Sequence, residues 1–188
     1  MALVVPKHLR WLTLSLLLLV TGVSAASSAE EISEDQVKAA YLFNFAKFVT
    51  WPPQAFGAPD SPINFCTLGR SGTIDELDSS IKGKIVNGHP IVIRHLHGFE
   101  EINNCHIFFL ADSAGKRQQE LFQAVGKLPV LLVGETSGFA QHGGDVDFIV
   151  DNGKVIFEVN TVAAENAHLK ISSKLLTLAR IVSPGAER

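Results

Sequence analysis

The chain contains two kinds of hydrophobic pattern, one with the period of a helix and one made of short continuous apolar runs. The helical pattern starts after Ser33, which forms a capping box with Gln36, a common opening of a helix. It ends before 51–53, Trp-Pro-Pro, because proline does not continue a helix. The apolar residues in between recur at helical spacing, and many are aromatic: Val37, Ala40, Tyr41, Phe45, Phe48 and Val49, with Leu42 and Phe43 widening the stripe. The pattern predicts one helix whose aromatic surface is either buried in the core or used for docking.

Between residues 63 and 133, apolar runs alternate with segments of helical period. The runs predict four strands, at 63–68, 91–93, 105–110 and 129–133. The periodic segments predict helices at 72–82 and 116–127, with a loop or one helical turn near 100–101. Because the runs are apolar throughout, we expect both faces of the strands to be buried, as in a parallel sheet between layers of helices.

The C-terminal part of the chain predicts a hairpin and a helix. Residues 145–150 and 154–160 are strand-like segments separated by Asp-Asn-Gly, which is typical of a hairpin turn. Asn160 or Thr161 is suited to cap the next helix. We predict this helix from 162 to 181, because its apolar residues fall mostly on one face. The predicted fold is therefore an α/β three-layer sandwich with a mainly parallel sheet flanked by helices, plus a C-terminal hairpin and helix.

Residues 1–25 have the organisation of a secretory signal peptide. A basic start is followed by an apolar run at 11–20 and by small residues that fit cleavage after Ala25, with Ala26 or Ala29 as alternatives. A membrane anchor is the other interpretation. Ten helical residues rise only about 15 Å, however, which is half of the hydrocarbon core. We therefore predict export and removal of the leader.

Removal of the leader changes the length, apolar content and net charge of the predicted mature protein. The 188 residues, 46% of them apolar, become a single predicted domain at 26–188, large enough to bury one core. The net charge falls from −3 to −5, because the leader carries Lys7 and Arg10 and no acidic residue. Nucleic-acid binding needs a basic face, so this balance argues against that class of partner.

Cys66 and Cys105 both lie in the predicted exported domain. An even cysteine count in an oxidising compartment predicts a disulfide. Each cysteine belongs to or borders a predicted strand, so a bridge between neighbouring strands is expected; two buried free thiols are the alternative. A CxxC pair is absent from the sequence, and a catalytic thiol is therefore not predicted.

Two glycine-containing loops are candidates for binding a small ligand. The first, at 69–73, lies between a strand and a helix, where backbone N–H groups beside Gly72 can hold an anion and Arg70 adds a charge. It lacks the Lys-[Ser/Thr] of a P-loop and the third glycine of a dinucleotide fingerprint. The second contains Gly143 and Gly144, which can shape a concave backbone. For both loops a simple chain turn is the alternative.

The sequence gives little support to catalysis or metal binding. A Gly-x-Ser-x-Gly elbow is absent, and a catalytic carboxylate pair cannot be recognised. His95 and His97 would project from one face of a strand, but a metal site needs a third ligand that the sequence does not indicate. We predict that the protein is not an enzyme and holds neither a metal nor another cofactor.

Seven segments, in order along residues 37–182, resemble the YfiR-like family of periplasmic proteins. They are Val37-Lys-Ala-Ala-Tyr-Leu-Phe-Asn-Phe-Ala-Lys-Phe-Val-Thr-Trp-Pro52, Cys66-Thr-Leu-Gly69, Cys105-His-Ile-Phe-Phe109, Pro129-Val-Leu-Leu-Val-Gly134, Gly138-Phe139 with Gly143-Gly144, Phe157-Glu-Val-Asn160 and Leu169-Lys-Ile-Ser-Ser-Lys-Leu-Leu176. Seven matches in the right order are more specific than any single one.

The resemblance implies a periplasmic regulator of cyclic di-GMP signalling and biofilm formation. Relatives of this kind bind the periplasmic sensor domain of an inner-membrane diguanylate cyclase and inhibit it, and an outer-membrane OmpA-like lipoprotein relieves the inhibition. They form homodimers and respond to redox state through disulfides. Cys66 and Cys105 are the pair carried over here, whereas the second pair of some relatives is missing.

An interaction protein of this kind needs an exposed apolar patch, which the aromatic helix is expected to supply. Phe43, Phe48 and Trp51 are its candidate anchors for a partner. The alternative function is a periplasmic small-ligand binding protein, for a nucleotide or another anion, that uses Arg70, Gly72, Gly143 and Gly144.

Overall fold

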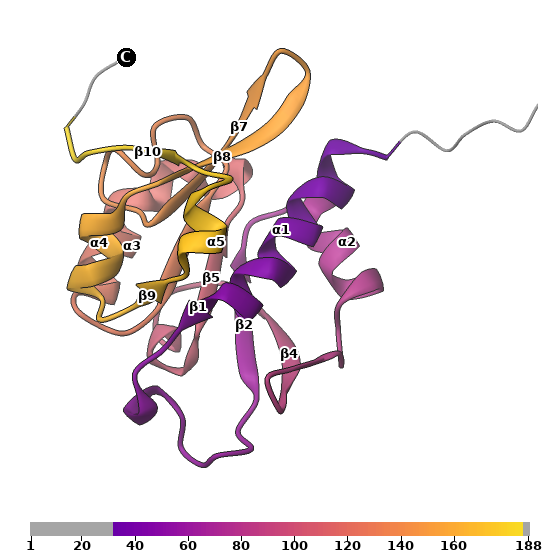
Figure 1. Cartoon of the computed structure of the whole chain (residues 1–188), viewed down its shortest axis with the longest axis vertical. Coiled ribbons are helices and arrows are strands. Elements are labelled where there is room, and N and C mark those ends of the chain that lie inside the picture. The colour runs from indigo at the N-terminus through magenta and orange to yellow at the C-terminus, as the bar shows by residue number, and fades with distance from the viewer. Residues whose placement is uncertain (1–31, 186–188) are drawn as a thin grey trace, which may run out of the picture. The chain divides into compact units, whose positions relative to one another are not determined.

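A computed structural model describes residues 32–185 of the chain, so the predicted signal peptide at 1–25 lies outside the described residues. Its main element is a sheet in the order β10-β8-β7-β6-β5-β2-β4-β3, most of whose strands are labelled in Figure 1. The strands of this sheet are β2 (Ile63–Leu68), β3 (Ile85–Val86), β4 (His89–Leu96), β5 (Ile107–Leu110), β6 (Leu131–Gly134), β7 (Val146–Asp151), β8 (Lys154–Val159) and β10 (Arg180–Ile181). The neighbours from β4 through β2, β5 and β6 to β7 are parallel, whereas β3 pairs antiparallel with β4, and β8 with β7. The sheet is thus mainly parallel, as predicted.

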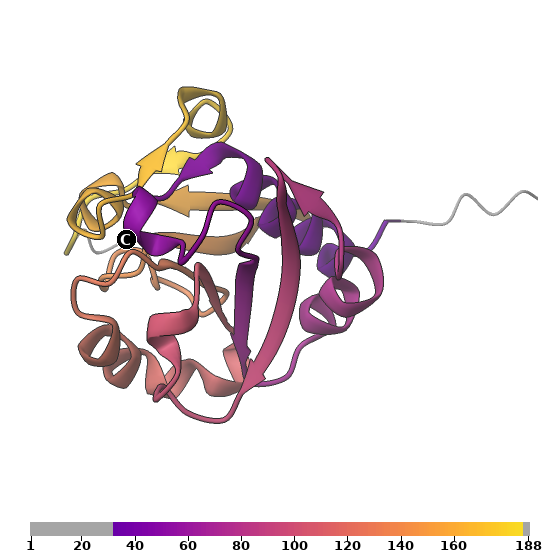
Figure 2. The ribbon, with the colours of Figure 1, turned by 90° about the horizontal axis from the view of Figure 1, so that it is seen from below.

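Helices cover both faces of the sheet. The helices are α1 (Glu34–Phe48), α2 (Gly72–Ser80), α3 (Gln118–Val125), α4 (Thr161–Asn166) and α5 (Ser173–Leu176), with 3-10 turns η2 (Pro53–Ala55), η3 (Ile102–Asn104) and η4 (Asp112–Arg117). Helix α1 contacts α2 and α5, and α3 lies across the sheet from α1 (Figure 2). This arrangement confirms the predicted α/β fold class.

The side chains of each central strand alternate between two hydrophobic cores. Phe65 and Phe109 pack in the core beneath α1, whereas Cys66 and Phe108 belong to the core beneath α3. Successive side chains of a strand point to opposite faces, so a strand covered on both sides must be apolar at nearly every position. The uninterrupted apolar runs of the sequence have this physical cause.

Helix α1 starts and packs as its sequence predicts. The Ser33 hydroxyl accepts from the Gln36 backbone N–H, and the Gln36 side chain accepts from the Ser33 N–H, which completes the capping box. Farther along, Phe45 lies 5.3 Å from the ring of Phe157 and 5.8 Å from the ring of Phe148, measured between ring centroids. The aromatic stripe therefore mainly fills the core between α1 and the sheet.

The predicted final helix, 162–181, is wrong. The segment forms α4, then β9 (Lys170–Ile171), then α5 and the edge strand β10. Asn160 caps α4 as predicted, but His168 adopts a left-handed backbone with φ of 58°. Strand β9 then pairs with β1 (Val49–Thr50), just after α1. This tertiary pairing replaces the helix that the local apolar spacing favours.

Smaller differences concern the ends of elements. The strand predicted at 91–93 extends over His89–Leu96, and the one predicted from 105 starts at Ile107. The predicted helix at 116–127 begins as the 3-10 turn η4. Among residues 32–185, no helix combines the length and hydrophobicity that crossing a membrane requires.

Candidate functional site

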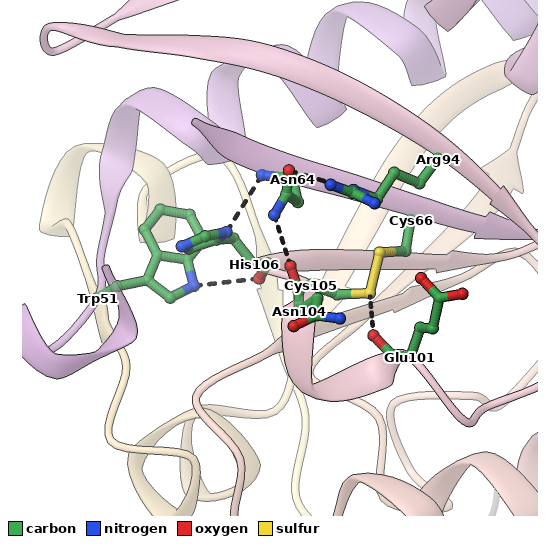
Figure 3. Close-up of a disulfide and its surroundings, with 8 residues drawn as sticks. All are labelled: Trp51, Asn64, Cys66, Arg94, Glu101, Asn104, Cys105 and His106. Carbon is green, nitrogen blue, oxygen red and sulfur yellow. Dashed lines mark hydrogen bonds between the residues drawn. A yellow bond between two sulfur atoms is a disulfide. The ribbon is translucent and has the colours of Figure 1, made fainter. Parts of the chain in front are cut away.

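The predicted disulfide is present between Cys66 and Cys105. Cys66 lies in β2, and Cys105 lies two residues before the neighbouring strand β5, with 5.7 Å between the two Cα atoms (Figure 3). The two cysteines are 1% and 5% exposed, respectively. The carbonyl oxygen of Glu101 lies 3.7 Å from Cys105 Sγ. The bridge thus fastens the 3-10 turn η3 to the centre of the sheet.

His106, next to the disulfide, connects three segments of the chain. Its Nδ1 accepts from the Asn64 backbone N–H at 3.1 Å, so Nε2 carries the proton and donates to the Ala55 carbonyl, also at 3.1 Å. Its carbonyl oxygen accepts from Trp51 Nε1 at 3.0 Å, and the Asn64 side chain donates to the Asn104 carbonyl at 2.7 Å (Figure 3). Burial lowers the pKa of His106, because the charged imidazolium loses hydration. His106 is therefore neutral, and its hydrogen bonds hold three segments of the chain together beside the disulfide.

The three aromatic residues predicted to bind a partner differ in how deeply they are buried. Trp51 is only 6% exposed, and its indole donates to His106, so in the described fold it belongs to the core and does not reach a surface. Phe48 is partly buried against the same core. Phe43 is also partly buried, but its ring is covered from outside by the ammonium groups of Lys47 at 4.1 Å and Lys84 at 5.1 Å from the ring centroid.

Phe43 therefore belongs to a small surface patch that the sequence did not indicate. Lys84 lies directly before β3, so the patch joins α1 to the start of that strand. We call Phe43, Lys47 and Lys84 the α1–β3 patch. It combines apolar surface with two positive charges, a combination suited to a partner with an acidic rim.

Arg70 lies in the loop between β2 and α2, and Gly72 is the first residue of α2; the two residues have different surroundings. A side chain at Gly72 would collide with the Asp35 carboxylate of α1, and the Thr73 hydroxyl donates to that carboxylate at 2.8 Å. Asp35 thus occupies the α2 N-terminus that the sequence offers to an anion. The Arg70 side chain is exposed instead, beside a cavity of about 630 Å³.

Gly143 and Gly144 lie in a different loop, before β7, and the packing of that loop explains the glycine at position 144. Asp147 accepts from the backbone N–H groups of Gly138 at 2.9 Å and Phe139 at 3.1 Å. A carboxylate of the protein itself thus binds the loop N–H groups that the sequence analysis offered to a ligand anion. A Cβ at Gly144 would overlap the Phe139 ring. Gly143, with φ of 125°, borders a separate cavity of about 230 Å³. The structure therefore does not bring the four predicted ligand-binding residues together.

Asp145 is a buried acid that the sequence analysis did not single out. It is 3% exposed at the wall of the 230 Å³ cavity, and its Oδ2 accepts from the Leu132 N–H at 2.6 Å. Burial raises its pKa to about 7, although the Leu132 hydrogen bond opposes this change. The position of Asp145, directly before β7, is visible in the sequence, but its burial depends on the packing of β6 and α4.

The candidate histidine pair, His95 and His97, has other surroundings in the described structure. His95 uses both ring nitrogens, Nδ1 with the Thr67 hydroxyl and Nε2 with Asp78, each at 2.9 Å. His97 follows the end of β4. Across residues 32–185, no three His, Cys, Asp or Glu side chains are grouped so that they could hold a metal ion.

Comparisons with known proteins give a family and a fold. The family model described as YfiR/HmsC-like matches residues 35–180. A comparison with curated proteins gives no significant match. Among solved structures, the crystal structure of an ABC domain in complex with L-Trp from Streptococcus pneumonia is similar, with a TM-score of 0.50 and 9% sequence identity over 79% of this chain. The match spans 60% of that structure's own length, and at this identity it shows the fold alone.

Proposed function

The chain belongs to the YfiR/HmsC-like family, and from this we propose that it is a periplasmic regulatory protein that binds and inhibits the periplasmic sensor domain of an inner-membrane signalling enzyme. We propose a diguanylate cyclase as that enzyme, so that the protein limits cyclic di-GMP and biofilm formation. The observation that carries the proposal is the family match, which extends from α1 to the edge strand β10.

The molecule has features that agree with this role. The Cys66–Cys105 disulfide fits an oxidising compartment and thus export to the periplasm. A regulator of this kind needs a rigid scaffold with a contact surface rather than catalytic acids and bases. We propose the periplasm as its location, a homodimer as its assembly and an outer-membrane OmpA-like lipoprotein as the partner that releases the cyclase.

We place the cyclase contact at the α1–β3 patch. Phe43 supplies an aromatic side chain, which is the residue type that most often dominates binding energy at an interface. Lys47 and Lys84 flank this ring and are suited to acidic residues of the sensor domain. This position keeps Phe43 among the predicted anchors, whereas Phe48 and Trp51 pack in or against the core.

The test uses Phe43→Ala, with Leu178→Ala as the matched control. Leu178 is 65% exposed after α5, so its loss removes an apolar surface side chain elsewhere. Purified variants that retain the wild-type melting temperature are titrated with the cyclase sensor domain. We expect Phe43→Ala to weaken binding by at least about tenfold, the scale of an interface hot spot, and Leu178→Ala to leave it unchanged.

Two further readouts separate the partner from the patch. Lys47→Glu with Lys84→Glu should slow association, because charges at an interface rim mainly set the association rate. Failure of the wild-type protein to bind the sensor domain would refute the cyclase assignment. Wild-type binding that a folded Phe43→Ala variant retains would refute only the position of the contact.

A further inference from the structure

A cavity of about 630 Å³ opens where three parallel strands end. Its walls come from the loops that follow β2, β4 and β5, together with one side of α2. The lining includes Leu68, Arg70, Ile74, Asp75, Leu96 and Arg117. The volume falls within the range of small-molecule sites, about 300–1,000 Å³.

The position of the cavity is the one at which open α/β sheets bind ligands. The chain passes from β2 outward to β4, then crosses to β5 on the other side of β2 and continues to β6. The connections that leave β2 and β5 thus run in opposite directions, and ligands of such sheets bind at the carboxyl ends of the strands beside this reversal. Ser113 connects the segment after β5 to the loop after β2, since its hydroxyl accepts from the Arg70 N–H at 2.8 Å and donates to the Arg70 carbonyl at 3.0 Å.

One wall of the cavity is fixed without any ligand. Arg117 donates to both carboxylate oxygens of Glu120 at 2.8 Å and to the His97 carbonyl at 3.0 Å, while its guanidinium lies 4.6 Å from the centroid of the Phe99 ring. Such a pre-formed wall lowers the ordering cost of binding.

The remaining polar groups of the cavity are free to meet a ligand. Within residues 32–185, the guanidinium of Arg70 and the carboxylate of Asp75 take part in none of the ion pairs, whereas Asp78 pairs with His95. Ser71 stands at the N-cap of α2, but its hydroxyl oxygen is closed to solvent and does not contact a ligand in the open cavity. Arg70 and Asp75 are therefore the groups that a ligand meets.

We propose that this cavity binds a small hydroxylated anion, such as a sugar phosphate or a sugar acid. The acidic group of the ligand pairs with Arg70, and its hydroxyl groups hydrogen-bond to Asp75. Leu68, Ile74 and Leu96 supply apolar contact for the carbon skeleton. This site is independent of the cyclase contact, because it uses none of the residues of the α1–β3 patch.

The test compares three molecules that share a sugar body. Purified protein is titrated with D-glucose 6-phosphate, D-glucuronate and D-glucose, and the melting temperature and binding heat are recorded. A ligand of the native state raises the melting temperature as its concentration increases. Stabilisation by either anion but not by glucose supports the site, and the anion that binds more tightly identifies the acidic group. No stabilisation by either anion at millimolar concentration would overturn the proposal.

Two variants locate the binding. Arg70→Gln should lower the affinity for the anion about tenfold, which is the factor expected from the loss of one charge-assisted hydrogen bond. Arg94→Gln removes another exposed arginine, one that does not line this cavity, and this variant should bind the anion as the wild type does. Equal affinity in Arg70→Gln and the wild type would refute the role of the cavity.

Discussion

Breaking the Cys66–Cys105 disulfide is expected to lower stability strongly while leaving the native fold in place. The two cysteines are 39 positions apart in sequence, and they belong to β2 and to the residues just before β5. These strands pair in parallel register from Phe65 with Ile107 to Leu68 with Leu110. We expect this pairing to persist without the bridge. Reduction therefore acts mainly on the unfolded chain, which gains the freedom that the closed loop denies it.

The size of the effect follows from the loop length. Closing a loop of this length is worth about 4 kcal/mol in the chain-entropy model. For a chain of 150–250 residues, 1 kcal/mol corresponds to roughly 2–4 °C in melting temperature. Complete reduction should thus lower the melting temperature by roughly 8–16 °C.

The assay is thermal unfolding with and without reductant, followed by circular dichroism. Thiol titration confirms that both cysteines are free, which matters because the bridge is buried. A Cys66→Ala and Cys105→Ala double variant is the control, since reductant should not change its melting temperature. A decrease of less than about 2 °C after confirmed reduction would refute the loop-closure reasoning.

Two further predictions concern buried polar groups. The pKa of Asp145 is raised from 3.8 to about 7, so the stability that its protonated form supplies is complete below pH 3.8 and is lost as the pH rises through about 7. Asp145→Asn keeps an acceptor for the Leu132 N–H. It should reduce the change in unfolding free energy between pH 4 and 8, measured by urea unfolding, by up to about 4 kcal/mol. Parallel pH profiles of the variant and the wild type would contradict this. Trp51→Phe removes the indole hydrogen bond to His106 and should cost about 1–3 kcal/mol in the same measurement, so an unchanged unfolding midpoint would show that this bond does not stabilise the fold.

Elements whose causes are local could be predicted from the sequence. The capping box at Ser33 and the cap at Asn160 depend on residues within one helical turn, and both form as expected. The central strands were recognisable because burial on both faces leaves no polar alternation, as in Ile107–Leu110. The cysteine pair needed only the compartment and the count.

Features that depend on long-range packing could not be predicted. Apolar spacing alone favours a helix through His168, whereas the chain turns there and β9 pairs with β1, more than 100 residues earlier in the sequence. The aromatic residues of α1 and of the segment just after it give no means to tell which rings are covered, so buried Trp51 and partly buried Phe43 look alike in the sequence. The cavity walls come from three separate loops that only the strand order brings together.

The disulfide also has a consequence for proteolysis. It closes the chain into a covalent ring that contains α2, β3, β4 and η3, and most of the wall of the 630 Å³ cavity. A protease that cuts once between Cys66 and Cys105 leaves the two fragments joined through the bridge. The ring can therefore be nicked without losing its covalent connection to the rest of the chain, whereas a cut outside it leaves two pieces that no covalent bond joins.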